Sequence, residues 1–140
     1  MKNPDGKYPR GCVAIFIHDG QGSILVGDRL KKTVVEGVPE VALPGGKIHW
    51  METAIEASVR EAREETGLEI EIERQVGYSD DIWRHLDTHC LTLYFQARVL
   101  GGKLAVMEPD KFAGLRWVRP EDVKILFADA HLHLPNLRLH

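Results

Sequence analysis

The chain has 140 residues, of which 44% are hydrophobic and 28% charged, with a formal net charge of -3. These values are typical of an ordinary globular protein, and the length fits one domain that buries roughly two thirds of its unfolded surface. No basic run is longer than Lys31-Lys32, which argues against DNA or RNA as a polymeric partner. No apolar run approaches the length of a membrane span, so we expect no membrane association.

The two cysteines, Cys12 and Cys90, both lie in apolar runs, where a buried free thiol is the usual state. A pair of cysteines without a secretory signal favours a reducing compartment over a disulfide. Residues 1–10 form a polar arm with no hydrophobic segment. We therefore expect a cytoplasmic protein with one domain over residues 1–140.

The first part of the chain predicts a β-hairpin followed by a loop. Residues 11–18 form a dense apolar run with β-branched side chains, which indicates a buried strand. A Gly-rich turn at 19–22 leads into residues 23–29, which pair back on the first strand. The polar stretch over 31–39 predicts a loop, and 41–43 a short strand before a Pro-Gly-Gly turn.

The second part predicts more strands and a short helix. Alternating patterns indicate strands over 69–83, 89–99 and 114–120. Pro120 stands at a plausible first helical position for residues 120–130. Strands interrupted by helices predict a mixed α/β or α+β domain in which helices pack on a sheet.

Between the Pro-Gly-Gly turn and the next strand the sequence predicts one longer helix. Thr53 and Glu56 form a capping box, and Gly67 stands where a glycine ends a helix. At about 100° per residue, one apolar stripe is expected to face the core: Ile55, Val59 and Ala62.

Three carboxylates, those of Glu61, Glu64 and Glu65, gather on one face of this helix, which we expect to lie opposite the apolar stripe. Carboxylates this close repel one another unless a cation lies among them, and Mg²⁺ takes oxygen ligands of this kind. Arg60 is near enough to orient one of them. The alternative is a solvated Glu/Arg-rich face held by ion pairs along the helix.

Residues 46–68 resemble the Nudix box, Gly-x5-Glu-x7-Arg-Glu-U-x-Glu-Glu-x-Gly-U, where U is a bulky aliphatic residue. The positions in register are Gly46, Glu52, Arg60, Glu61, Glu64, Glu65, Gly67 and Leu68. Ala62, at the first U position, is the one departure. The resemblance implies a Nudix-type α/β/α sandwich with a mixed sheet flanked by helices. It also implies an enzyme that uses Mg²⁺, with Mn²⁺ as a substitute, to hydrolyse a substrate linked to a nucleoside diphosphate.

The resemblance assigns candidate roles. The metal ligands would be the backbone carbonyl of Gly45 and the side chains of Glu61, Glu64 and Glu65. Glu61 and Glu64 are also the candidate catalytic groups, with the choice of base left open, and Arg60 orients a carboxylate. Glu52 ties the loop to the helix start. Family members often recruit a further acid from a distant loop. Here Glu108 and Asp110 are the candidates, Glu108 being preferred, and the alternative is that both are plain loop acids.

The same resemblance suggests substrate contacts at Arg29 for phosphate and at Trp117 and Phe127 for the base. The alternatives are a solvated strand-end arginine and ordinary core aromatics. We expect a nucleoside triphosphate to yield the monophosphate and pyrophosphate. A nucleotide-sugar or dinucleoside polyphosphate substrate is the runner-up, and a non-catalytic nucleotide sensor a further alternative. A homodimer is a candidate assembly, since dimers are common for this fold.

Overall fold

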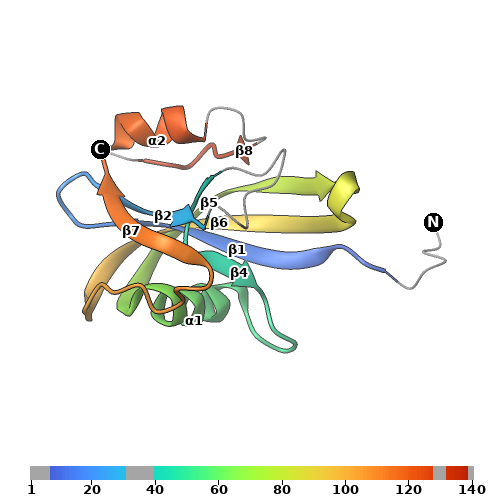
Figure 1. Ribbon diagram of the computed structural model, residues 1–140, viewed down its shortest axis with the longest axis horizontal. Helices are drawn as coiled ribbons and strands as arrows, with labels where there is room; N and C mark the ends of the chain where they lie inside the picture. The colour runs from blue at the N-terminus through green and yellow to red at the C-terminus, as the bar shows by residue number, and fades with distance from the viewer. Residues whose placement is uncertain (1–6, 31–39, 128–131, 139–140) are drawn as a thin grey trace.

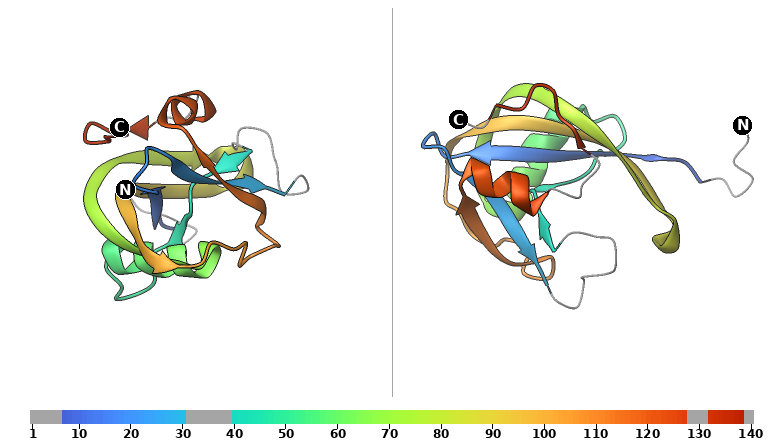
Figure 2. Two further views of the ribbon diagram at one scale, coloured as in Figure 1. Left: turned by 90° about the vertical axis from the view of Figure 1, so that its left-hand side faces the viewer. Right: turned by 90° about the horizontal axis from the view of Figure 1, so that it is seen from above.

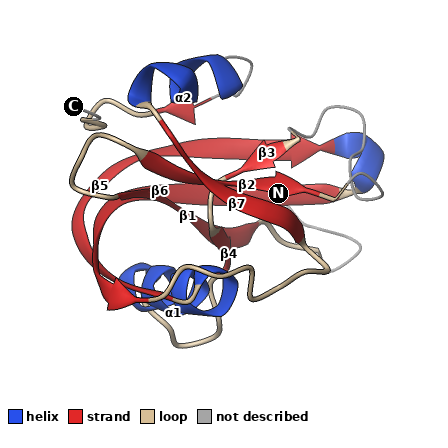
Figure 3. Ribbon diagram, turned by 60° about the vertical axis from the view of Figure 1, so that its left-hand side comes forward, coloured by secondary structure: helices blue, strands red, loops and turns tan. Residues whose placement is uncertain are grey.

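A mixed β-sheet lies between two helices that cover opposite sides of it (Figure 1). The computed structural model describes residues 7–30, 40–127 and 132–138. Its elements run in this order: β1 (Arg10–His18), β2 (Ile24–Arg29), β3 (Val41–Ala42), β4 (Gly45–Lys47), α1 (Ala54–Thr66), β5 (Leu68–Trp83), the 3₁₀ turn η2 (Arg84–Leu86), β6 (Thr88–Gly102), β7 (Phe112–Val118), α2 (Pro120–Leu126) and β8 (Leu132–His133). The predicted α/β/α sandwich is confirmed, and Figure 3 shows its three layers.

The sheet is mixed because one of its strand pairs is parallel. Within the described ranges it has eight strands, in the order β3-β2-β1-β6-β5-β8, with β4 paired to β1 and β7 paired to β2. β1 runs parallel to β6, from Arg10 opposite Cys90 to His18 opposite Arg98. The other described pairs are antiparallel, and the β1–β2 hairpin is confirmed. β1 has β4 and β2 along its other edge, so the sheet divides there into two branches.

The central strand is apolar along its length because both of its faces are covered. Successive side chains of a strand point to opposite faces. Ile15 and Ile17 pack in a cluster with Ala62 of α1, whereas Phe16 packs in a cluster with Val123 of α2. This two-sided burial explains why residues 11–18 read as a continuous hydrophobic run.

β5 and β6 form a long antiparallel hairpin that curves around the sheet, as both views of Figure 2 show. Its register shifts in three places along β5, between residues 69 and 70, 72 and 74, and 75 and 77. Bulges of this kind increase local twist and bend a strand. The curvature lets one hairpin contribute to both core clusters, through Ile70 on the α1 side and Val76 on the α2 side.

Helix α1 begins and ends as predicted, and Val59 and Ala62 of the predicted stripe pack in the core, but Ile55 does not. The Thr53–Glu56 capping box is present, and Gly67 ends the helix with φ 76°. The expectation that Ile55 faces the core is wrong, because 52% of that residue is exposed. The buried side of the helix consists of Ala57, Ser58, Glu61, Ala62, Glu65 and Thr66. Two of the three glutamates therefore lie on the packed side of the helix, not on the face away from the core.

The remaining expectations are mostly confirmed within the described residues. The strands predicted over 69–83, 89–99 and 114–120 are present as β5, β6 and β7. The final helix is shorter than predicted, since α2 ends at Leu126, and 128–131 lie outside the described residues. The predicted loop at 31–39 and most of the polar arm also lie outside them. Both cysteines are free thiols. No helix in the described ranges has the length and apolar character needed to cross a membrane.

Candidate active site

The backbone of Gly45 and Gly46 passes unusually close to β1 and α1. β4 pairs with β1 so that Gly45 lies opposite Ala14. A Cβ on Gly45 would stand 2.1 Å from the carbonyl oxygen of Val13, so the chain can make this crossing only with glycine. The crossing places the carbonyl of Gly45 beside helix α1, whose acidic residues lie on the same side.

Glu65 is the centre of this region. It is fully buried, and its Oε1 accepts a hydrogen bond of 3.0 Å from the backbone N–H of Gly45. Its Oε2 accepts a hydrogen bond of 2.9 Å from Nζ of Lys111, and the neighbouring carboxyl of Glu61 acts to raise the pKa of Glu65. Burial raises the pKa of Glu65 to about 7, although Lys111 and the Gly45 N–H both act to lower it. A carboxylate this deeply buried requires a cationic partner.

Lys111 donates to a second oxygen of the same region. Its Nζ lies 3.0 Å from the carbonyl oxygen of Gly45. One ammonium group is thus held between a backbone carbonyl and a buried carboxylate, the same two oxygens that the sequence resemblance assigns to a metal ion. About a third of the Lys111 side chain is exposed, so this cation approaches from the solvent side.

Arg60 connects the remaining acids to the loop that precedes the helix. Its Nε and Nη2 donate to the carboxylate of Glu52 at 2.7 and 2.9 Å, and Nη2 also donates to the carbonyl of Lys47 at 2.9 Å. Its Nη1 donates to Glu61 at 2.8 Å and to Glu64 at 3.1 Å. The hydrogen bonds from Arg60 hold the pKa of the Glu52 carboxyl down at about 2. Glu52 therefore links the loop to the helix, and the guanidinium orients two of the candidate catalytic carboxylates.

Glu61, Glu64 and Glu65 of α1 differ in their exposure to solvent. Glu65 is enclosed, and Glu61 is 8% exposed with its carboxylate against Gly46, where a Cβ would stand 2.6 Å from Oε1. Glu64 is different, because half of its side chain is exposed. The carboxylate of Glu65 is thus buried beside the backbone, whereas that of Glu64 is accessible at the surface.

Arg29, the candidate phosphate contact, belongs to the sheet. It ends β2, where it lies opposite Phe112 of β7, the residue after Lys111. Burial lowers the pKa of Arg29, and its electrostatic interaction with Glu65 raises it. The assignment of Arg29 to substrate phosphate stays a prediction.

The donor set fits a hard divalent cation. The oxygens of Gly45 and Glu65 already converge on one cation, the ammonium of Lys111, and oxygen ligands are what Mg²⁺ and related ions require. In the described parts of the chain, no three His, Cys, Asp or Glu side chains converge as a ready-made metal cage. The carboxylates are instead oriented by Arg60 and Lys111. Any ion bound here would therefore take over positions that these side chains now hold.

The other residues predicted to bind metal or base do not lie together in one site. Glu108 contributes its backbone carbonyl, which accepts hydrogen bonds from the N–H groups of Lys111 and Phe112 at 3.0 and 3.1 Å. Trp117 packs with the core cluster on the α1 side, whereas Phe127 packs with the cluster on the α2 side. The two aromatics therefore lie against different faces of the sheet and do not form the two walls of one pocket.

Lys111 was not among the residues predicted from the sequence. A lysine two residues after a proline carries no local signal. Its position depends on the turn at Glu108 and on the pairing of β7 with β2, which are long-range features. A polar group on the opposite face was also missed. There Tyr94 and Asp81 lie 2.9 and 3.0 Å from the hydroxyl of Ser79, and Thr92 donates to Asp81 at 2.6 Å.

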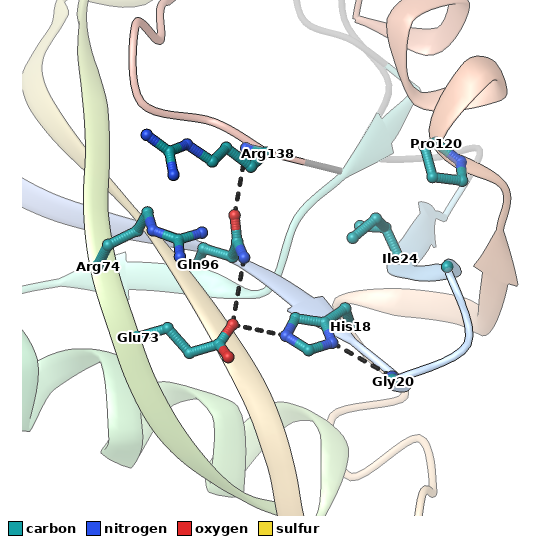
Figure 4. Close-up of a pocket in the computed structure, with 9 residues that line it drawn as sticks. His18, Gly20, Ile24, Glu73, Arg74, Gln96, Pro120 and Arg138 are labelled. Carbon is teal, nitrogen blue, oxygen red and sulfur yellow. Dashed lines mark hydrogen bonds and ion pairs between the residues drawn. The ribbon is translucent and has the colours of Figure 1, made fainter. Parts of the chain in front are cut away.

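A separate pocket of about 340 Å³ opens beside α2 and contains none of the predicted residues (Figure 4). His18 and Glu73 both line it and are in contact at 2.6 Å, and Gln96 donates to Glu73 at 3.2 Å. Arg74 and Arg138 lie along one wall in the same view. The pocket does not share a lining residue with the acidic cluster of α1.

Comparison with known proteins agrees with this geometry. Residues 8–137 match the family described as the NUDIX domain. A Bacillus subtilis (strain 168) protein described as a putative 8-oxo-dGTP diphosphatase is 32% identical over 113 residues, which are 81% of this chain and 68% of that protein. The chain belongs to the NUDIX family and is a MutT-like Nudix hydrolase.

Two solved structures illustrate the likeness of fold. A MutT NUDIX hydrolase from Burkholderia pseudomallei is 31% identical, with a TM-score of 0.67 over 81% of this chain and 84% of that one. A MutT protein from Methanosarcina mazei Go1 has a TM-score of 0.70 over 89% of this chain and 91% of that one, at 22% identity. The second likeness supports the fold alone.

Proposed function

We propose that this Nudix hydrolase converts a nucleoside triphosphate to the monophosphate and pyrophosphate, with Mg²⁺ as the working ion. The observation that carries the proposal is the convergence of the Gly45 carbonyl and the Glu65 carboxylate on one cation, beside Glu61. The choice of a triphosphate is supported by the Bacillus subtilis relative, which is described as a putative 8-oxo-dGTP diphosphatase.

The residues that would hold the ion are Gly45, Glu65, Glu61 and Glu64. Bound there, the ion would offset phosphate charge and acidify a coordinated water molecule. We place Glu65 and the Gly45 carbonyl as the anchoring ligands because they are the most fixed of the oxygens. Glu64 is half exposed, so its carboxylate is the one that faces entering substrate and water. Between Glu61 and Glu64 the choice of base stays open.

In the reaction, a water oxygen forms a bond to phosphorus and the anhydride bond between the α and β phosphoryl groups breaks. The proton lost by water passes to a carboxylate of the cluster, and the bridging oxygen leaves with the phosphoryl group that water does not attack. Arg60 fixes the carboxylates of Glu61 and Glu64 before the reaction begins, which avoids the cost of reorganising them at the transition state. Arg29 supplies a fixed positive charge for the polyphosphate.

The test is product analysis with a panel of substrates in the presence of Mg²⁺. Nucleoside triphosphates, oxidised and normal, are compared with ADP-ribose, nucleotide sugars and dinucleoside polyphosphates. We expect stoichiometric monophosphate and pyrophosphate from a triphosphate. Release of inorganic phosphate from triphosphates, or preferred cleavage of a sugar or dinucleotide substrate, would contradict the proposal.

Two substitutions complete the experiment. Glu65→Gln and Glu64→Gln remove one charged oxygen each and are expected to lower kcat by about 100-fold or more. Glu71→Gln is the matched control, because Glu71 lies on β5, where its carboxylate pairs with Arg98 at 3.1 Å. Turnover by Glu64→Gln equal to that of the wild type would show that Glu64 is not a metal ligand.

A further inference from the structure

Lys111 occupies a position that a divalent ion would also need. Its Nζ contacts the Gly45 carbonyl at 3.0 Å and Oε2 of Glu65 at 2.9 Å. Metal–oxygen distances for Mg²⁺ are about 2.1 Å, so an ion bound to both oxygens would lie in the space that the ammonium now fills. Two cations at such a separation repel strongly in a partly buried site. The ammonium and the ion therefore exclude each other.

The backbone of Lys111 is fixed by hydrogen bonds, whereas its side chain can move out into solvent. The turn at Glu108 accepts hydrogen bonds from the backbone of Lys111 and Phe112. Phe112 is 1% exposed, and its ring lies so close to Gly27 that a Cβ there would stand 2.6 Å from it. The Lys111 side chain, in contrast, is about one third exposed. It can turn into solvent without disturbing β7.

The contact between Lys111 and Glu65 also stabilises the metal-free protein. Glu65 is fully buried, and an ionised carboxylate without a partner in such a place is strongly destabilising. Gly45 supplies one N–H to Oε1, but Oε2 has the Lys111 ammonium as its cationic partner. The Lys111 ammonium thus offsets the charge of Glu65 while no ion is bound.

We infer that Lys111 is a built-in competitor of the divalent ion, which holds the Gly45 and Glu65 oxygens in the metal-free protein and must be displaced before the ion binds. The inference rests on the proposed metal ligands. It assigns Lys111 as a positioning residue that sets the metal affinity of this enzyme. If the released form is about a tenth of the metal-free population, Lys111 weakens the apparent metal affinity about tenfold.

The test measures Mn²⁺ binding without nucleotide, by the loss of the free-ion electron paramagnetic resonance signal at pH 8. Lys111→Met removes the charge with little change in length and is expected to bind Mn²⁺ about tenfold more tightly than the wild type. Lys103→Met, which makes the same charge change in the segment between β6 and β7, is the control and is expected to bind like the wild type. Equal or weaker binding by Lys111→Met overturns the inference.

Glu65→Gln separates this inference from the proposed function. If it loses Mn²⁺ binding while Lys111→Met binds like the wild type, the metal site stands and the competition is wrong. If Glu65→Gln binds as tightly as the wild type, or if no variant binds Mn²⁺, the ligand assignment fails and the inference fails with it.

A second measurement needs no substitution and so does not depend on the folding of a variant. With lysine labelled with ¹³C at Cε and assigned sequentially, saturating Mg²⁺ is expected to move the Lys111 signal and to leave that of Lys103 in place. A Lys111 signal unchanged by Mg²⁺ overturns the inference.

Discussion

The carboxylate of Glu61 rests against the Cα of Gly46, so that a Cβ at position 46 would stand 2.6 Å from Oε1 and 2.8 Å from Oε2. The neighbouring Gly45 has a different constraint, because a Cβ there would stand 2.1 Å from the backbone oxygen of Val13. Gly46 thus leaves space for the side chain of Glu61, whereas Gly45 leaves space for the main chain of β1.

This difference predicts opposite outcomes for two adjacent substitutions. Gly46→Ala is expected to fold, because the end of the flexible Glu61 side chain can move, but its kcat should fall about tenfold or more as the carboxylate is displaced. Gly45→Ala should be destabilised by several kcal/mol, because backbone cannot move so easily. Denaturant titration and steady-state kinetics on both variants check this. A Gly46→Ala enzyme with wild-type kcat would show that the position of Glu61 is unimportant.

Glu52 is expected to act on the reaction through Arg60. Its carboxylate accepts two hydrogen bonds from that guanidinium, which in turn orients Glu61 and Glu64. Glu52→Gln keeps the size of the side chain but weakens this bidentate pair. We expect kcat to fall about 10-fold to 100-fold with a smaller change in KM.

Glu69→Gln is the matched control for Glu52→Gln, since Glu69 pairs with Arg63, which is exposed, at 2.6 Å. Its kcat should stay within about twofold of the wild type, because surface substitutions away from a site have small effects. Equal losses in the two variants would contradict a specific role for Glu52.

The buried carboxyl of Glu65 predicts how stability depends on pH. Burial raises its pKa from 4.5 to about 7, so the folded protein binds this proton more tightly than the unfolded chain does. The stabilisation from that proton is complete below about pH 4.5 and is lost as pH rises through about 7. Without metal, the free energy of unfolding should therefore fall by about 3 kcal/mol between pH 4.5 and 8 because of this group.

Urea unfolding in the presence of a chelator, for wild type and Glu65→Gln, measures this dependence. The variant should show a flatter profile between pH 5 and 8. Glu52 does not interfere, because its pKa is lowered to about 2 and its contribution changes only at more acidic pH. Parallel profiles in the two proteins would mean that Glu65 titrates as an ordinary carboxyl.

Much of the fold could be predicted because its signals are local. The apolar run of β1, the capping box at Thr53 and the αL glycine at Gly67 each depend on a few neighbouring residues, and each is present in the structure. The order of strands in the sheet was not predicted. The family resemblance implied only a mixed sheet flanked by helices, and the β1–β6 parallel pair joins residues far apart in sequence.

The orientation of α1 was predicted less well because periodicity cannot distinguish an apolar stripe from a buried polar one. Ile55 looked like a core residue and Glu65 like a surface residue, but the structure exposes the first and buries the second. The Gly45 crossing accounts for this, because it gives the buried carboxylate an N–H partner that no helical pattern encodes. Lys111 reaches the same carboxylate through long-range strand pairing, which local sequence also does not reveal.

The exposed position of Ile55 gives a simple test of that correction. Ile55→Glu is expected to change the free energy of unfolding by less than about 0.5 kcal/mol, since surface substitutions rarely do more. Ala57→Leu, which inserts extra volume at a fully buried site, should cost about 1–3 kcal/mol. Chemical denaturation of the two variants compares them directly. A large loss of unfolding free energy in Ile55→Glu would show that Ile55 packs in the core, as the periodicity predicts.

The most direct measurement is a calorimetric titration of Mg²⁺ into the protein bound to a non-hydrolysable nucleoside triphosphate analogue, for wild type and Glu65→Gln. We expect saturable Mg²⁺ binding by the wild type and binding weakened about 10-fold to 100-fold or more in the variant. Saturable binding of equal strength in both proteins, or no binding in the wild type, would contradict this expectation.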